Sequence, residues 1–369
     1  MNNKIAPLTS LRFFAALCVF VHHLGSDGLI PERWLGHFQL WEGVSFFFVL
    51  SGFVLQYSYR DKIREIGCCE FLRLRLVRIC PLHLLTLCLA LPFVFALTTG
   101  AQILANATLT QAWVPRKSFA YSVNSVSWTL SVELFFYALF PCVAFALRRH
   151  PVILALSLFT GATVYFVIFD TRDAAAAISH FGICPLARLP EFILGMVVGE
   201  IALNRSTWYS LIGTGAEIAI LVITVTANWC MGYLPNLVWP VGGMSATVWL
   251  DNVGCAPFFA ALIFVYAISA GGIARVLSLP AFVFMGEISF GFYLFHPLGI
   301  RIAGHLSGPV WQVVAAFTLT VSMATGSYLA FERPLMGLAR RSCNSRQPSN
   351  VLRERYGDFD PAYIRDGLR

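Results

Sequence analysis

Ten long apolar runs constrain the fold of this chain more than any other feature. A helix needs roughly 20 mostly apolar residues to cross about 30 Å of hydrocarbon. Only 12% of the 369 residues are charged and 57% are hydrophobic, a balance that excludes an ordinary soluble domain. We therefore expect an all-α, polytopic helical membrane protein with about ten transmembrane helices. The runs are residues 9–25, 41–58, 79–98, 128–147, 151–169, 184–202, 209–228, 253–270, 280–298 and 311–331.

The positions of the Lys and Arg residues predict how the chain lies in the membrane. With the N-terminus inside, 19 of the 26 fall in cytoplasmic segments, five fall outside and two lie within spans. Positive charge collects on the cytoplasmic side, so we expect both termini in the cytoplasm and the protein in the inner (plasma) membrane. Residues 236–252 are apolar enough to dip into the bilayer. A full crossing there would put the arginine-rich C-terminus outside, and we predict that they do not cross.

The composition also limits partners and cofactors. We expect one membrane-embedded domain over residues 1–335 and a basic, flexible cytoplasmic tail over 336–369. Topology and attraction to anionic membrane lipid account for the net charge of +7, so nucleic acid is not an expected partner. The ten cysteines form no CxxC pair and no Cys/His cluster, so we predict no metal site. A disulfide between Cys230 and Cys255 is an alternative that the sequence does not decide.

The first apolar run carries a cation at one end and two imidazoles at the other. Eleven residues separate Arg12 from His23, so on a helix they differ by about 20° in direction and about 16 Å in height. His22 falls about 80° from Arg12 and leaves that face. An arginine facing lipid near mid-membrane costs at least about 2.5 kcal/mol, which favours a cavity beside this face. The alternative is that Arg12 reaches the inner headgroups while His23 ends the helix.

The other runs place further polar groups at two depths. With His23, an outer cluster of acids, bases and hydroxyls is expected near the outer ends of three runs. Just before the third run, on the inner side, arginines collect at Arg73, Arg75 and Arg78, and Arg75 and Arg78 share a helix face. Arginine forks suit phosphate, although juxtamembrane arginines also follow from topology alone. The outer cluster comprises Trp128, Ser131, Glu133, Arg188, Glu191, Ser289, Tyr293 and His296.

Several ionisable groups have only structural interpretations from sequence. Glu42 lies near an outer helix end, and Glu217 is a lone carboxylate that pairs with a neighbour. The glycines and serines of GVSFFFVLSGF, residues 43–53, favour close packing of two helices.

Seven segments in order resemble the acyltransferase 3 family of membrane O-acyltransferases. The resemblance covers about residues 9 to 335. It implies a ten-helix acyltransferase core that uses cytoplasmic acyl-CoA as co-substrate, binds no further cofactor, and acylates carbohydrate or other hydroxylated acceptors. The segments are LRFFAALCVFVHH, GVSFFFVLSGFVL, RLVRICP, SWTLSVELFFYALFP, RLPEFILGMVVG, ISFGFYLFHPL and FERPL.

The family's site residues carry over by position. Its Arg and His signature in the first helix falls on Arg12 and His23, and its Arg-x-x-Arg falls on Arg75 and Arg78. Its tryptophan, serine and glutamate helix falls on Trp128, Ser131 and Glu133. Two positions depart from the family: Ser45 stands where many members have an acid, and Cys80 stands where many have Tyr. The resemblance also implies a stand-alone core without a periplasmic esterase-like domain, which relies on glycan-assembly proteins as partners.

Together these patterns predict acyl transfer. The phosphates of acyl-CoA would rest on Arg12, Arg75 and Arg78, and the thioester would meet His23, a base suited to neutral pH, with Glu133 orienting the imidazole. Acetyl is the acyl group expected from family frequency. The acceptor would be an exopolysaccharide or lipopolysaccharide unit, with a macrolide or other secondary metabolite as the alternative. Direct transfer and an acyl-enzyme on His23 or Ser131 both stay open. A transporter or flippase of a polar solute or lipid-linked glycan is the competing class.

Overall fold

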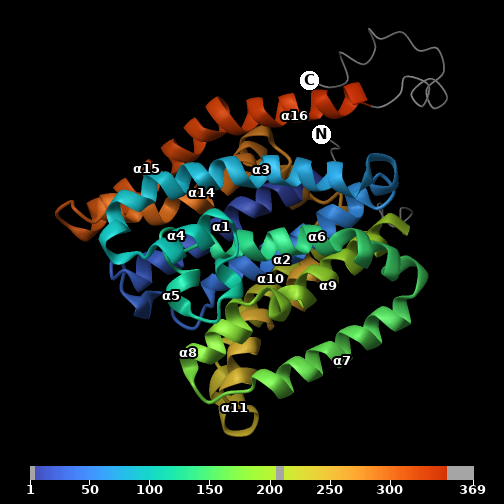
Figure 1. The fold of residues 1–369 in the computed structure, drawn as a ribbon, viewed down its shortest axis with the longest axis horizontal. Coiled ribbons are helices and arrows are strands. Elements are labelled where there is room, and N and C mark those ends of the chain that lie inside the picture. Colours follow the sequence, from blue (N-terminus) through green and yellow to red (C-terminus); the bar gives the residue numbers. More distant parts are fainter. Residues whose placement is uncertain (1–4, 205–211, 347–369) are drawn as a thin grey trace.

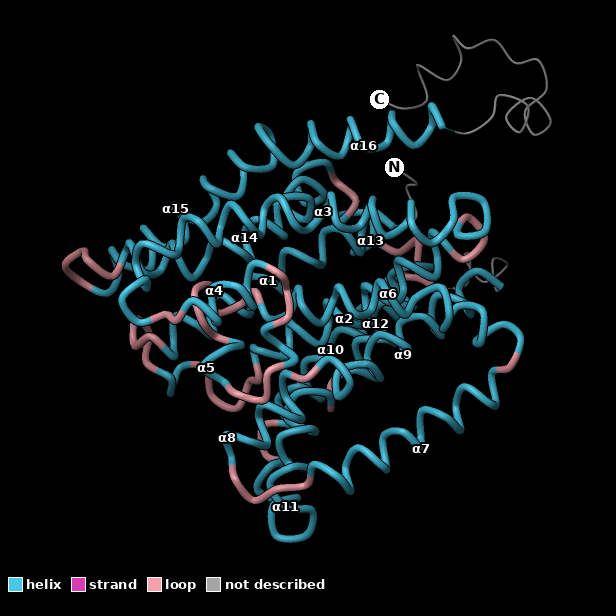
Figure 2. The backbone as a smooth tube through the Cα atoms, in the orientation of Figure 1, coloured by secondary structure: helices cyan, strands magenta, loops and turns pink. Residues whose placement is uncertain are grey.

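The computed structural model describes residues 5–204 and 212–346. Every regular element among these residues is helical, and the loops gather at the helix ends (Figure 2). The main helices are α1 (Ala6–Ser26), α2 (Gly43–Tyr59), α3 (Ile63–Val94), α6 (Trp128–Arg149), α7 (Pro151–Phe169), α9 (Pro185–Asn204), α10 (Thr214–Met231), α11 (Leu234–Val253), α12 (Ala256–Ile268), α14 (Pro280–Ala303), α15 (Pro309–Ser327) and α16 (Arg333–Arg346). Shorter helices are α4 (Gly100–Ala107), α5 (Lys117–Ala120), α8 (Ala174–Ala177) and α13 (Gly272–Leu277).

The described residues contain ten stretches long and apolar enough to cross a membrane, one for each predicted run. This confirms the fold class. The third stretch begins at residue 63 rather than 79, because α3 continues across a bend at Gly67, where φ is +76°. Arg75 and Arg78 lie on one helix, as predicted, and the correction is that the apolar stretch begins before them and includes them.

The predicted re-entrant segment forms α11, which bends at Gly243, where φ is +70°. The part after the bend joins α12 in a single apolar stretch, Gly243–Ile268. Residues 236–252 therefore add no eleventh stretch, but residues 243–252 belong to the eighth stretch, which begins at 243 instead of the expected 253.

Close backbone contact joins α2 to α9. A Cβ atom added to Gly52 would lie 1.9 Å from the carbonyl oxygen of Phe192, and one added to Gly195 would lie 1.9 Å from that of Val49. Small residues allow helices in lipid to approach until their backbones touch. The expected packing role of the 43–53 segment is confirmed, and α2 is held against the centre of the bundle.

The edges of the bundle follow from the same sequence patterns. No residue of α7 is buried, and the helix runs apart from the other helices (Figure 1), as suits a segment that is apolar on all sides. At the C-terminal end, α15 continues through a π-helical segment, Tyr328–Glu332, into α16. The helix thus extends past residue 335, and Arg73 of α3 donates to the carbonyl oxygen of Ala339 at 3.4 Å. Residues 347–369 of the expected tail lie outside the described residues.

Candidate functional site

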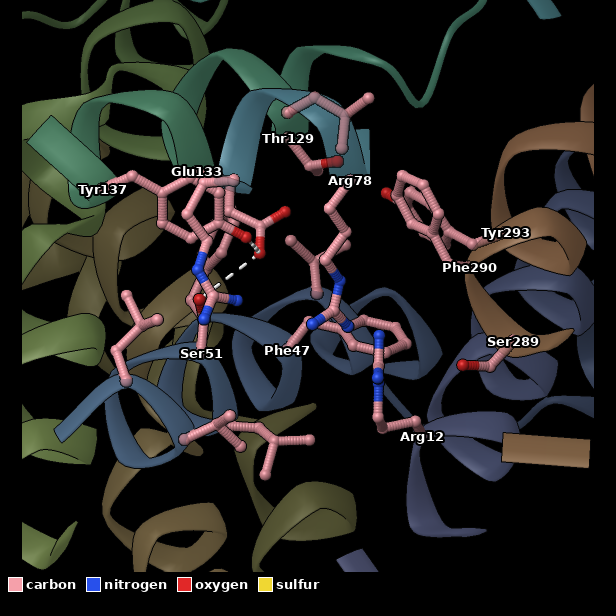
Figure 3. Close-up of a pocket in the computed structure, with 17 residues that line it drawn as sticks. Arg12, Phe47, Ser51, Arg78, Thr129, Glu133, Tyr137, Ser289, Phe290 and Tyr293 are labelled. Carbon is pink, nitrogen blue, oxygen red and sulfur yellow. Dashed lines mark hydrogen bonds between the residues drawn. The ribbon is translucent and has the colours of Figure 1, made fainter. Parts of the chain in front are cut away.

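A cavity at the centre of the bundle is walled by five helices, α1, α2, α3, α6 and α14 (Figure 3). Six of the residues singled out from the sequence line it. They are Arg12, Arg75, Arg78, Glu133, Ser289 and Tyr293. The remaining lining residues are mostly apolar side chains of α2. The tertiary structure therefore brings the arginines of the first and third helices to one place.

The three arginines of this cavity have no hydrogen bond or salt bridge within the described chain. Arg12 and Arg78 point towards each other from α1 and α3 (Figure 3). Arg75 is only 6% exposed, and its Nε has no hydrogen-bond partner there. Buried guanidiniums are normally paired or hydrogen-bonded because removing their hydration is costly. Three cations that form no salt bridge, with Glu133 as the carboxylate among the described lining residues, make a site suited to a polyanion.

Aromatic rings hold Arg75 in place instead of an acid. Its guanidinium carbon lies 4.4 Å from the centre of the Tyr59 ring, 5.5 Å from that of Phe71 and 5.7 Å from that of Tyr137. Contacts over a ring face stabilise a cation without consuming its N–H donors. The donors of Arg75 therefore stay available to a ligand.

The carboxylate of the cavity is Glu133, one and a half turns into α6. It accepts hydrogen bonds from the hydroxyls of Ser51, at 3.3 Å, and Tyr137 (Figure 3). The sequence predicts Glu133 in one outer cluster with His23 and His296. The structure corrects this, because α3 carries its arginines into the bundle to the depth of Glu133. No hydrogen bond joins Glu133 to His23 among the described residues.

The outer histidines form a separate cluster. The ring of His23 lies 5.1 Å from that of His296 and 5.3 Å from that of His22, measured between centroids. His296 is fully buried, and neither of its ring nitrogens meets hydrogen-bond geometry with another described residue. The His296 ring lies 5.7 Å from that of Tyr293, which lines the arginine cavity. A continuous row of rings thus connects the cavity wall to His23.

The remaining sequence candidates lie outside the cavity. Trp128 packs edge-on to Phe48, with 6.3 Å between ring centres, and Ser131 is 1% exposed. Arg188 and Glu191 form a buried ion pair with 2.7 Å between Nε and Oε2, and Arg188 also donates to the carbonyl oxygen of Gly182. These four residues are packed in the protein, and the structure does not bring them to the arginines.

Sequence reasoning missed several residues of the site. Tyr137 and Ser51 bind Glu133, and in the sequence each is one hydroxyl-bearing residue within an apolar run. Tyr59 covers Arg75 and directly follows the second apolar run. Tyr137 lies four residues after Glu133, and this helical spacing was the signal in the sequence that could have identified it.

Glu217, expected to pair with a neighbour, accepts hydrogen bonds from the Ser269 hydroxyl and from the backbone N–H groups of Ile273 and Ala274 at the start of α13.

The fold and the cavity define a multi-pass membrane protein with an internal cationic site open to a ligand. The sequence model of the acyltransferase domain family matches residues 6–332, and the chain belongs to this family of membrane O-acyltransferases. No solved structure matches the chain.

Curated relatives agree with this assignment. The chain is 29% identical to acyltransferase MdmB of Streptomyces mycarofaciens, over 92% of this chain and 93% of that protein. It is 28% identical to the exopolysaccharide production protein ExoZ of Rhizobium meliloti, over 81% of this chain and 91% of that protein. It is 26% identical to O-acetyltransferase OatA of Staphylococcus aureus, over 89% of this chain but 56% of that protein.

Proposed function

We propose that the protein transfers an acetyl group from acetyl-CoA to a hydroxyl of a carbohydrate acceptor, such as an exopolysaccharide or lipopolysaccharide unit, in the inner membrane. One observation carries the donor part of this proposal. Arg12, Arg75 and Arg78 face one cavity and form no salt bridge with the described residues, in a protein of an acyltransferase family. Coenzyme A carries several phosphate groups, which guanidinium forks bind with charge-assisted hydrogen bonds.

The cytoplasmic origin of the donor follows from the predicted topology. Arg78 enters the cavity from α3, whose N-terminal end we expect at the cytoplasmic surface. The phosphates of acyl-CoA would approach from that end, and the thioester would extend along the face of α1 that carries Arg12 and then His23. Glu133, bound by Ser51 and Tyr137, would fix the position of the arginines opposite it and limit their mutual repulsion.

The proposed chemistry at the outer end is base-assisted transfer. His23 would take the proton of an acceptor hydroxyl while its oxygen attacks the thioester carbonyl. The carbon–sulfur bond then breaks, and the coenzyme A sulfur leaves and receives the proton held by His23. Ser131 is poorly suited to carry an acyl group because it is 1% exposed and does not line the cavity. In the alternative route through an acyl-enzyme, His23 would be the acyl acceptor.

The acceptor class is supported by the relatives. ExoZ is an exopolysaccharide production protein and OatA an O-acetyltransferase. A macrolide or other secondary metabolite is the alternative acceptor. Glycan-assembly proteins are the partners that would present a growing carbohydrate chain.

The test uses inside-out membrane vesicles that contain the protein and radiolabelled acetyl-CoA added outside. We expect label in the glycan fraction, and none above background in vesicles that contain the His23→Ala variant. Label in a small-molecule fraction would support the secondary-metabolite alternative. Absence of label from every fraction, together with faster movement of a polar solute, would replace the enzyme with the transporter or flippase class.

A further inference from the structure

A second cavity lies beside α14 and shares no residue with the arginine cavity. It is bounded by the C-terminal half of α3, residues 97–102, residues 118–125 and the turns Leu294–Arg301 of α14. Its volume is about 260 Å³, close to the ~300 Å³ at which small-molecule sites begin. We call it the hydroxyl cavity, after the side chains that line it.

The lining of the hydroxyl cavity combines seven apolar residues with nine polar ones, eight of them neutral and one a cation. The described lining residues include no carboxylate. Tyr121 contributes a phenol hydroxyl, which donates and accepts hydrogen bonds. Hydroxyls and amides that surround a space of this size match a molecule that itself carries many hydroxyls, and a tyrosine ring supplies an apolar face for a sugar ring. The polar lining residues are Thr86, Thr98, Gln102, Ser118, Tyr121, Ser122, Asn124, Ser125 and Arg301.

The loop that forms one wall is held in a strained conformation. Val123 has a φ of +58°, a region that β-branched residues rarely adopt and that persists only where the surroundings enforce it. Three side-chain amides enforce it here. Gln102 donates to the carbonyl oxygen of Ser118 at 2.7 Å, Asn106 to the hydroxyl of Ser122 at 2.7 Å, and Asn124 to the carbonyl oxygen of Leu294 at 3.0 Å. The wall is therefore fixed before a ligand arrives, which lowers the entropic cost of binding.

Three groups of this lining remain available to a ligand. The hydroxyls of Tyr121 and Ser125 make no hydrogen bond within the described chain. Arg301 donates one N–H to the carbonyl oxygen of Phe93, at 3.4 Å, and has further donors left. The other polar groups largely hold the wall, so these three would make the direct contacts.

We propose that the hydroxyl cavity is the acceptor site and holds a carbohydrate segment next to the hydroxyl that is acylated. The inference rests on the proposed function and assigns a place to its second substrate. The two cavities share a wall: Tyr293 lines the arginine cavity, and its neighbour Leu294 lines the hydroxyl cavity. Tyr293 donates to the carbonyl oxygen of Val126 at 3.4 Å, which closes this wall. The same turn of α14 carries His296, which contacts His23.

The decisive variant fills the hydroxyl cavity from α3. Ala90 lines it, whereas the adjacent Leu89 is 43% exposed on the outside of the bundle, so Ala90→Trp and Leu89→Trp are matched. Purified protein would transfer label from acetyl-CoA to surface polysaccharide extracted from cells that lack the protein. We expect Ala90→Trp to lower kcat/KM for the polysaccharide by at least about tenfold and Leu89→Trp to change it less than about twofold, with acetyl-CoA binding unchanged in both.

Smaller variants decide the matter if Ala90→Trp does not fold. Tyr121→Phe and Ser125→Ala each remove one donor, and each should raise the KM for the polysaccharide by about fivefold. An unchanged KM in both, with wild-type transfer intact, would overturn the acceptor site while the proposed function stands. If wild-type protein labels no polysaccharide, the carbohydrate acceptor itself fails, and the two failures are thereby distinguished.

Discussion

Arg12 and Arg78 come from helices α1 and α3, yet they point at each other across one cavity, and neither forms a salt bridge with a described residue (Figure 3). Two cations held together in a membrane protein raise its free energy unless an anion joins them. Glu133 is the one carboxylate that lines this cavity, and it is already bonded to Ser51 and Tyr137. The pair therefore favours a bound form of the protein in which a polyanion lies between the two side chains.

Removal of one of these cations should weaken donor binding selectively. Arg78→Ala is expected to raise the KM for acetyl-CoA between about 10-fold and 100-fold, the value of one or two charge-assisted hydrogen bonds. Its kcat should change by less than about threefold. Arg73→Ala is the control, because Arg73 lies on the same helix but pairs with Glu70. A change in the acceptor KM alone would contradict the assignment of Arg78.

Loss of the proposed base should stop transfer and leave binding intact. We expect His23→Ala to lower kcat by about 10² to 10⁴, with the protein inserted at normal levels and the Kd for acetyl-CoA within about twofold. His22→Ala is the matched variant, since His22 leaves the face shared by Arg12 and His23. Wild-type transfer rates in His23→Ala would rule out the proposed base.

The contact between α2 and α9 predicts that replacing one of its glycines by alanine lowers stability, although alanine has the higher helix propensity. Alanine stabilises an exposed helix position by about 1 kcal/mol relative to glycine. At Gly195 the added Cβ would meet the carbonyl oxygen of Val49, so Gly195→Ala should destabilise the protein by about 1–3 kcal/mol or more. Gly161→Ala in α7 is the control, because no atom lies within 4 Å of its added Cβ. Thermal unfolding in detergent should show a lower Tm for the first variant only.

The buried pair of Arg188 and Glu191 predicts a second effect on stability. Glu191→Gln leaves the Arg188 charge buried without a counter-charge, which costs about 3–5 kcal/mol. The double variant Arg188→Met and Glu191→Leu removes both charges and should recover most of the lost Tm. A double variant less stable than Glu191→Gln alone would show that the pair itself, and not the uncompensated charge, determines the effect.

The fold class and the number of candidate spans follow from the order of the amino acids alone. Whether an apolar run is long enough to cross the bilayer depends only on the residues of that run. Ten stretches could therefore be counted without coordinates. The Arg12 and His23 face of α1 is equally local, because helix geometry fixes the direction of each side chain. The family motifs were also visible in the sequence, and the family match over residues 6–332 confirms them.

Which polar groups share a cavity depends on how the helices pack, and this could not be read from the sequence. Helix α3 begins sixteen residues before the expected position, at residue 63 instead of 79, and so carries Arg75 and Arg78 to the level of Glu133. The same packing separates Glu133 from His23 and places His296 beside that histidine instead. The helical repeat of 3.6 residues fixes the direction in which each side chain points around its helix. It does not fix the depth in the membrane at which two neighbouring helices contact each other. Depth is set by contacts between helices distant in sequence, such as the glycine contact of α2 with α9.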